Sequence, residues 1–125
     1  MKKPEKFSTE TVVLVDTTER DRTRLALIHG SKVIVIDKPL RAQSLQEQLE
    51  KLLKKDHQTF ADIDAFAVLT KPGSLTGVRI GVVAVNTIAW LQDIPVIEVN
   101  SASFEQALRQ PFSSLKKRKL ARVRY

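Results

Sequence analysis

The sequence predicts a single α/β domain built on a five-stranded mixed sheet. Three runs rich in β-branched residues come first, separated by polar turns, which is typical of an antiparallel meander. Helix, strand, helix and strand patterns then follow in that order, and parallel strands require such crossover connections. The chain has 125 residues, of which 42% are hydrophobic, enough for one compact core. We therefore predict three antiparallel strands and two parallel strands, with helices packed on the sheet.

The meander strands are predicted at residues 11–15, 23–28 and 32–36. Gly30 lies in the short polar turn between the second and third runs, where glycine can adopt a positive φ angle. Pro39 ends this part of the sheet because proline cannot donate to a strand ladder.

A helix is predicted to begin at Ser44, because Ser44 and Glu47 have the spacing of a capping box. The apolar residues that follow share one helical face, and they are Leu45, Leu49, Leu52 and Leu53. Two lysines at residues 54–55 suit the negative end of the helix dipole, so the helix is expected to end there.

The second half of the sheet begins with an apolar run at residues 65–69, which predicts a buried strand. A Pro-Gly pair then breaks the strand, and Ser74 can cap a long apolar helix. Gly77 and Gly81 lie on one face of this helix, where each costs about 1 kcal/mol relative to alanine. We expect their bare face to allow close packing against another element or contact with a ligand.

The rest of the chain predicts one more strand and one more helix. The strand is expected at residues 95–99, and Ser103 can cap a short helix that Pro111 interrupts. Trp90, near the end of the long apolar helix, is expected to lie in the core rather than to serve as a stacking platform.

The net charge of +7 comes entirely from the C-terminal part of the chain. All 14 acidic residues lie at or before Glu105, so we divide the chain into a domain, residues 1–110, and a basic tail, residues 111–125. The tail is either a solvated charged segment or a surface for RNA or an acidic partner. Its candidate contact residues are Lys116, Lys117, Arg118, Lys119, Arg122 and Arg124. Leu115, Leu120 and Val123 favour a tail helix that is partly docked on the body.

Several classes of site are excluded by composition. The chain has no cysteine, so it has no disulfide, no Cys-ligated zinc and no thiol catalysis. His29 and His57 are isolated and have no metal-ligand spacing, so no metal site is expected. The charged N-terminal residues do not resemble a signal peptide, and no run of eighteen apolar residues occurs, so we expect a cytoplasmic protein.

Residues 71–81 resemble the signature of the bacterial TsaB (YeaZ) family, Gly-Pro-Gly-Ser-Phe-Thr-Gly-Val-Arg-Ile-Gly. Nine of the eleven positions match, and the chain differs at Lys71 and Leu75. Three further segments are similar to the family, namely the Asp-Thr-Thr of residues 16–18, the Asp-Ile-Asp-Ala of residues 62–65 and residues 94–101. The resemblance covers about residues 12–108.

The resemblance implies an actin-like (ribonuclease H-like) domain and a non-catalytic subunit of the machinery that makes threonylcarbamoyladenosine in tRNA. It implies a TsaD-like catalytic partner, a TsaE-like ATPase as a further component, and a homodimer through the same helices as an alternative. The residues implied at the partner interface are Leu45, Leu49, Gly73, Ser74, Thr76, Gly77, Arg79, Ile80, Gly81 and Ala84. The chain ends where relatives begin a second similar domain.

The resemblance also places Asp16, Thr17 and Thr18 where actin-like ATPases hold a phosphate-contacting loop. It implies that the chain alone binds no cofactor. It also implies that ATP or ADP with magnesium could bind at an interface shared with the partner. The residues themselves are typical of an Asx-type turn. We favour that turn over a nucleotide site because the resemblance implies a cleft that two domains complete. The alternative functions are a degenerate family member acting as a basic RNA-binding module and, less favoured, an independent ATPase.

Overall fold

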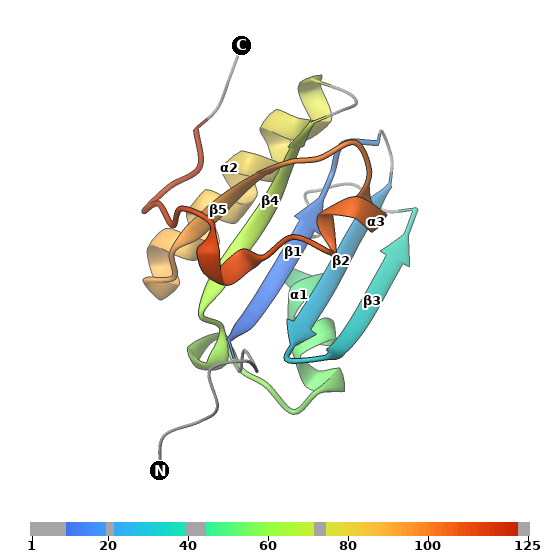
Figure 1. The fold of residues 1–125 in the computed structure, drawn as a ribbon. Helices are drawn as coiled ribbons and strands as arrows, with labels where there is room; N and C mark the ends of the chain where they lie inside the picture. The colour runs from blue at the N-terminus through green and yellow to red at the C-terminus, as the bar shows by residue number, and fades with distance from the viewer. Residues whose placement is uncertain (1–9, 20–21, 40–44, 72–74, 123–125) are drawn as a thin grey trace.

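A five-stranded sheet with the order β3-β2-β1-β4-β5 forms the centre of the computed structural model, which describes residues 10–19, 22–39, 45–71 and 75–122 (Figure 1). The strands are β1 (Thr11–Asp16), β2 (Thr23–His29), β3 (Lys32–Lys38), β4 (Ala65–Lys71) and β5 (Val96–Asn100). The helices are α1 (Leu45–Lys55), α2 (Leu75–Gln92) and α3 (Phe104–Ala107), with single 3-10 turns η2 (Phe60–Asp62) and η3 (Phe112–Ser114). None of the helices in these ranges combines the length and apolar character that crossing a membrane requires.

The strand directions confirm the predicted mixed sheet. Strands β1, β2 and β3 form an antiparallel meander, in which Leu14 pairs with Ala26. Strand β4 is parallel to β1 and β5 is parallel to β4, so Ala67 lies between Leu14 and Ile97. Gly30, in the turn between β2 and β3, has a φ of 63°, which confirms the predicted tight turn.

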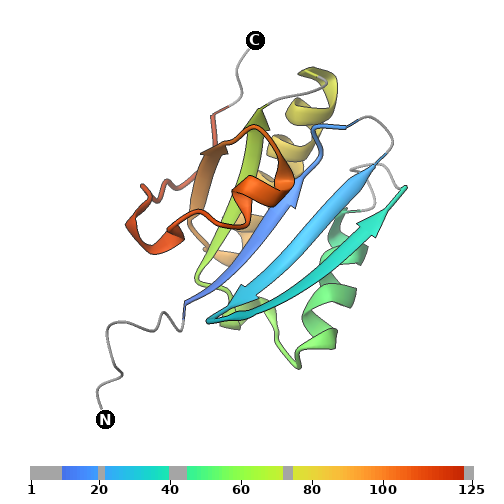
Figure 2. The same cartoon turned by 45° about the vertical axis from the view of Figure 1, so that its right-hand side comes forward.

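Two apolar cores cover the two faces of the sheet, because successive strand residues point in opposite directions. Helices α1 and α2 pack on one face, against side chains such as Val13 and Phe66. The other face carries α3 and the C-terminal segment, which pack against residues such as Leu14 and Ile97. Figures 1 and 2 show α3 on the side of the sheet opposite to α1 and α2.

The leucine stripe of α1 is part of the first core. All four predicted leucines are buried, because α1 lies against β2 and β3. The proposed cap, Ser44, lies outside the described residues, as do Gly73, Ser74 and Arg124. The predicted cap of the last helix is confirmed, since the Ser103 hydroxyl accepts a hydrogen bond from the Gln106 backbone N–H at 3.2 Å.

The basic C-terminal segment is docked on the body, but the predicted tail helix is wrong. Beyond η3 the chain runs extended beside β5, where Arg118 and Val96 exchange two backbone hydrogen bonds of 2.7 Å. Further along, the Ala121 backbone donates to and accepts from the Asn86 side chain, at 2.7 and 2.8 Å. These partners on β5 and α2 satisfy backbone groups that a helix would have satisfied internally.

The apolar anchors of this segment also differ from the prediction. Phe112 and Ala121 are buried in the two cores, and Leu115 is half-buried, whereas Leu120 is exposed. Val123 lies outside the described residues. Residues 111–122 are therefore a packed part of the domain surface and not a detached polycation.

Candidate functional site

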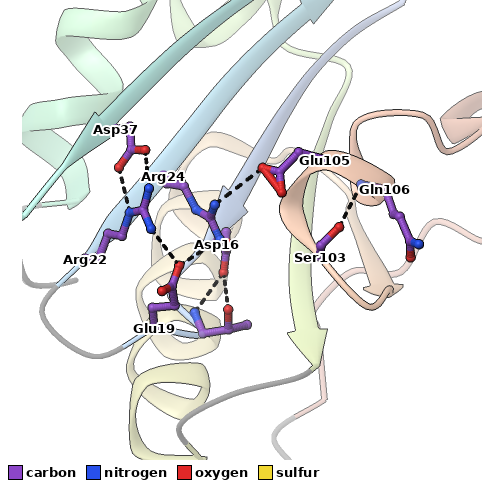
Figure 3. A network of polar contacts seen from close by, with 9 residues as sticks. Asp16, Glu19, Arg22, Arg24, Asp37, Ser103, Glu105 and Gln106 are labelled. Carbon is purple, nitrogen blue, oxygen red and sulfur yellow. Dashed lines mark hydrogen bonds and ion pairs between the residues drawn. The ribbon is translucent and has the colours of Figure 1, made fainter.

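The turn after β1 is closed by hydrogen bonds within the chain. Asp16 is 2% exposed, and its Oδ1 accepts from the Thr18 backbone N–H at 2.8 Å and from the Thr18 hydroxyl at 2.6 Å. Its Oδ2 accepts from the Arg24 guanidinium at 2.7 Å (Figure 3). This is the geometry of the Asx-type turn that the residues favour, and both carboxylate oxygens have partners.

Arg24 joins this turn to two other parts of the fold. Its guanidinium lies 3.0 Å from the Glu19 carboxylate and 3.5 Å from that of Glu105, and it sits over the Phe104 ring at 4.9 Å (Figure 3). Arg24 is not among the residues that the sequence predicts at a site. Strand register could have indicated it, because Asp16 and Arg24 are directly opposed in the hairpin of β1 and β2.

A second arginine, Arg22, extends the same network toward the protein surface. It donates to the two oxygens of Asp37 at 2.9 and 2.6 Å and to Glu19 at 3.1 Å. The two hydrogen bonds from Arg22 to Asp37 hold the pKa of the Asp37 carboxyl below its ordinary value. The pair is exposed to water, so it orders the surface more than it stabilises the core.

The Asp16 turn does not fit a magnesium-bound nucleotide in this arrangement. Magnesium is held through free carboxylate oxygens, whereas those of Asp16 are buried and bonded to Thr18 and Arg24. Thr17 is also buried, so its side chain is not presented to a phosphate. In the described part of the chain, no group of three or more histidine, aspartate or glutamate residues is placed to hold a metal ion.

The inner face of α2 packs against this turn. A Cβ atom on Gly81 would lie 1.9 Å from the Thr17 hydroxyl oxygen, so the bare face of this glycine meets the chain's own first turn. Leu45 and Leu49 are likewise core residues and present no surface to a partner in this structure. Arg79 and Ala84 are half-buried, and Thr76 and Gly77 lie in the first turn of α2.

The opposite side of α2 carries an exposed apolar stripe, here called the outer α2 face. It consists of Ile80, Val83, Trp90 and Leu91, which are 42%, 54%, 59% and 75% exposed. The core position predicted for Trp90 is wrong. Its neighbours Ala89 and Ile88 are the buried ones, and α2 is apolar on both sides, so composition does not reveal which side faces the sheet.

Within the described residues, the basic residues of the C-terminal segment divide into a group with carboxylate partners and an exposed group without them. Lys117 contacts Glu10 at 2.5 Å, and both Arg118 and Arg122 contact Glu98, at 3.8 and 2.9 Å. The hydrogen bonds from Arg122 hold the pKa of Glu98 below its ordinary value of 4.5.

The exposed group of this segment contains Lys116 and Lys119, which have no carboxylate partner among the described residues. The Lys119 ammonium lies 4.8 Å from the centre of the Trp90 ring, which is a cation–π contact.

Comparisons with known proteins identify relatives of this chain. Residues 40–108 match the family model described as TsaD: tRNA N6-adenosine threonylcarbamoyltransferase. Over 52 residues the chain is 40% identical to the tRNA N6-adenosine threonylcarbamoyltransferase of Lactiplantibacillus plantarum, covering 42% of this chain and 15% of that protein. Over 54 residues it is 43% identical to the tRNA threonylcarbamoyladenosine biosynthesis protein TsaB of Bacillus subtilis, covering 43% and 24%.

The fold is also similar to that of a solved relative. YeaZ from Pseudomonas aeruginosa superposes with a TM-score of 0.66 and 28% identity, over 73% of this chain and 44% of that one. The chain thus spans less than half the length of each of these three relatives. The family match covers more than half of the chain and includes α1, β4, α2 and β5. The chain belongs to the family described as TsaD, tRNA N6-adenosine threonylcarbamoyltransferase, and within it is a TsaB-like member.

Proposed function

We propose that the chain is a TsaB-like subunit that binds a TsaD-like partner through the outer α2 face and supports threonylcarbamoyl transfer to adenosine in tRNA. In this role it positions or stabilises the partner and performs no chemistry itself. The outer α2 face is the observation that carries the proposal, and the family match supplies the reaction in which such a subunit would take part.

The outer α2 face has the properties of a helix-mediated interface. Ile80 and Val83 are separated by three positions and Leu91 lies eight beyond Val83, so they follow one side of the helix. Large apolar side chains that share a surface mark a docking site more often than scattered ones do. An amphipathic helix that docks into an apolar groove uses anchors at this spacing.

The closed Asp16 turn supports a role without catalysis by this chain. A chain that supplied a nucleotide site alone would need an accessible carboxylate, and Asp16 is engaged by Thr18 and Arg24. We propose that ATP or ADP with magnesium, and any TsaE-like ATPase, belong to the assembled complex. The alternative to a TsaD-like partner on the outer α2 face is a second copy of this chain, which would give a homodimer.

The proposal is tested by Val83→Glu in the complete chain. A carboxylate in the middle of an apolar interface should weaken binding to a TsaD-like protein from the same source by at least about tenfold, because the charge would lose its water. Val35→Glu is the matched control, since Val35 is a similarly exposed valine on β3. Far-UV circular dichroism would show that both variants are folded, and titration calorimetry would give both affinities.

Two results would contradict the proposal. One is unchanged affinity of a folded Val83→Glu variant. The other is equal formation of threonylcarbamoyladenosine, measured by mass spectrometry of tRNA nucleosides, in reactions of the partner with and without this chain. Sedimentation of the chain alone would reveal a homodimer, and Val83→Glu should dissociate it if the same face is used.

A further inference from the structure

A cleft of about 310 Å³ lies between the C-terminal end of α2 and the basic segment. Trp90, Asp93 and Pro95 line one side, and Lys117, Arg118 and Lys119 line the other. Figures 1 and 2 both show the last turn of α2 beside the C-terminal segment. The cleft therefore combines an aromatic ring with three cationic side chains and one carboxylate.

The two walls of the cleft are held in place by backbone contacts. The Arg118 backbone is bonded to Val96 of β5, and the Ala121 backbone is bonded to Asn86 of α2. These contacts fix the basic segment on both sides of Lys119. The cations are thus presented by a structured wall rather than by a free tail, which lowers the entropy lost when a ligand binds.

A net positive charge remains beside the cleft once Lys116, which does not line it, is counted with the lining residues. Lys117 and Arg118 are paired with Glu10 and Glu98, but Lys119 is exposed and its contact is with the indole ring. Lys116, next in the chain, is also exposed. Asp93 and the negative end of the α2 dipole oppose these charges.

The dipole effect is reduced because two of the last carbonyls of α2 already accept hydrogen bonds. Asp93 adopts a positive φ of 56°, and the Ile94 amide then donates to the Ala89 carbonyl at 2.9 Å. The carbonyl of Trp90 accepts from the Asp93 amide at 3.4 Å. The cleft can therefore accept an anionic group beside the ring.

We infer that this cleft binds a single strand of nucleic acid, with a base against the Trp90 ring and phosphates on Lys116 and Lys119. Proteins that bind single strands combine a positive groove with an exposed aromatic side chain on which a base stacks. Trp90 is 59% exposed, so much of its surface remains open beside Lys119. This inference does not rest on the proposed TsaB-like role, since it uses neither the partner nor the reaction, although Trp90 belongs to both the cleft and the outer α2 face.

Intrinsic fluorescence gives a direct test, because Trp90 is the only tryptophan in the chain. The complete chain is titrated with a single-stranded RNA of mixed sequence, about five nucleotides or longer so that it spans the site. A stacked base should quench the Trp90 emission at the same midpoint as that given by anisotropy of a labelled strand. Binding with unchanged Trp90 emission would overturn the inference, as would no binding at low salt.

Variants separate the roles of the ring and of the charges. Trp90→Ala should weaken RNA binding at least about fivefold, the lower end for loss of base stacking, and Trp90→Phe should recover most of the affinity. Val33→Ala is the control, because Val33 is an exposed apolar residue of β3 that neither lines the cleft nor belongs to the outer α2 face. An equal loss in Trp90→Ala and Val33→Ala would contradict a specific role for the ring.

The charge contribution is read from the salt dependence. Loss of one phosphate contact should make the slope of log affinity against log salt shallower by about 0.7, which is expected for Lys119→Gln. Lys51→Gln, an exposed lysine on α1, should leave the slope unchanged. If both variants give the wild-type slope, Lys119 does not contact phosphate and the inference fails.

Two further ligands, single-stranded DNA and polyglutamate, show which chemical groups the cleft recognises. A single-stranded DNA of the same sequence that binds equally would show recognition through base and phosphate, and tighter RNA binding would add a contribution from the 2′-hydroxyl. Both outcomes support the inference. Polyglutamate of the same charge that competes with RNA and binds equally well to Trp90→Ala would overturn it in favour of an acidic protein partner.

Discussion

Gly81 of α2 and Thr17 of the β1 turn are in contact so close that no side chain fits between them. A Cβ atom at position 81 would lie 1.9 Å from the Thr17 hydroxyl oxygen and 2.9 Å from its Cβ. The Thr17 Cβ is attached to the backbone and cannot rotate away. This contact explains why a helix that would gain from alanine at this position has glycine there.

Gly81→Ala should therefore destabilise the fold by up to about 2 kcal/mol. Overpacking costs about 1–3 kcal/mol, and the better helix propensity of alanine offsets about 1 kcal/mol of that cost. Urea denaturation followed by circular dichroism would measure the difference. Thr87→Ala, on the exposed side of the same helix, is the control and should change stability little.

The double variant Thr17→Ala/Gly81→Ala should recover part of the lost stability. Thr17→Ala removes the hydroxyl oxygen and the methyl carbon, which lie 1.9 and 3.0 Å from the added Cβ, but it leaves the Cβ at 2.9 Å. The two substitutions should therefore be non-additive. Strict additivity, or a stable and well-folded Gly81→Leu variant, would show that the two residues are not in contact.

Arg24→Leu should cost about 3 kcal/mol of stability at pH 7, which is the lower end for breaking a buried ion pair. Asp16 would remain buried with a negative charge, although it would keep its two hydrogen bonds from Thr18. The measurement is again the free energy of unfolding in urea. Arg22→Gln is the matched control, since its partner Asp37 lies in water, and it should lose far less. Similar losses in both variants would mean that Arg24 is not the central residue of the network.

The contribution of Glu98 to the docking of the C-terminal segment should be lost in acid. The pKa of Glu98 in the folded chain is lowered from 4.5 by Arg122, so its contribution to stability is present above pH 4.5 and is lost as the pH falls through the lowered value. Glu98→Gln should therefore lower stability at pH 7, and its difference from the wild type should vanish in acid, once the pH lies below the lowered pKa of Glu98.

The comparison with the wild type at each pH is essential, because Asp37 and Asp56 also have lowered pKa values and weaken the wild-type fold in acid. Glu50→Gln, an exposed residue of α1, should match the wild type at both pH values. A stability loss in Glu98→Gln that is the same at pH 7 and in acid would rule out this ion pair as the source.

The purified chain should show no steady hydrolysis of ATP. The carboxylate of Asp16 is held by Thr18 and Arg24, so neither of its oxygens is free to hold magnesium. A coupled phosphate-release assay would test this. Turnover that persists through purification and disappears in Asp16→Ala would show that the turn opens to form a working site.

The sequence by itself determined the order and type of the elements. The β-branched runs, the leucine spacing of α1 and the glycine at position 30 are local features, and each depends on residues a few positions apart. The family signature at residues 71–81 is also local, so the fold class and the TsaB-like relationship could be predicted without coordinates.

Only the tertiary structure decided which surfaces are free. Trp90 and Gly81 belong to one helix that is apolar on both sides, and its periodicity could not show that Gly81 faces Thr17 while Trp90 faces water. The docking of Arg118 on Val96 and of Ala121 on Asn86 depends on contacts across 22 to 35 positions of the chain. The hydrogen-bond partners of this segment lie on β5 and α2 and not among its neighbours in the sequence. These contacts therefore depend on the sheet being formed.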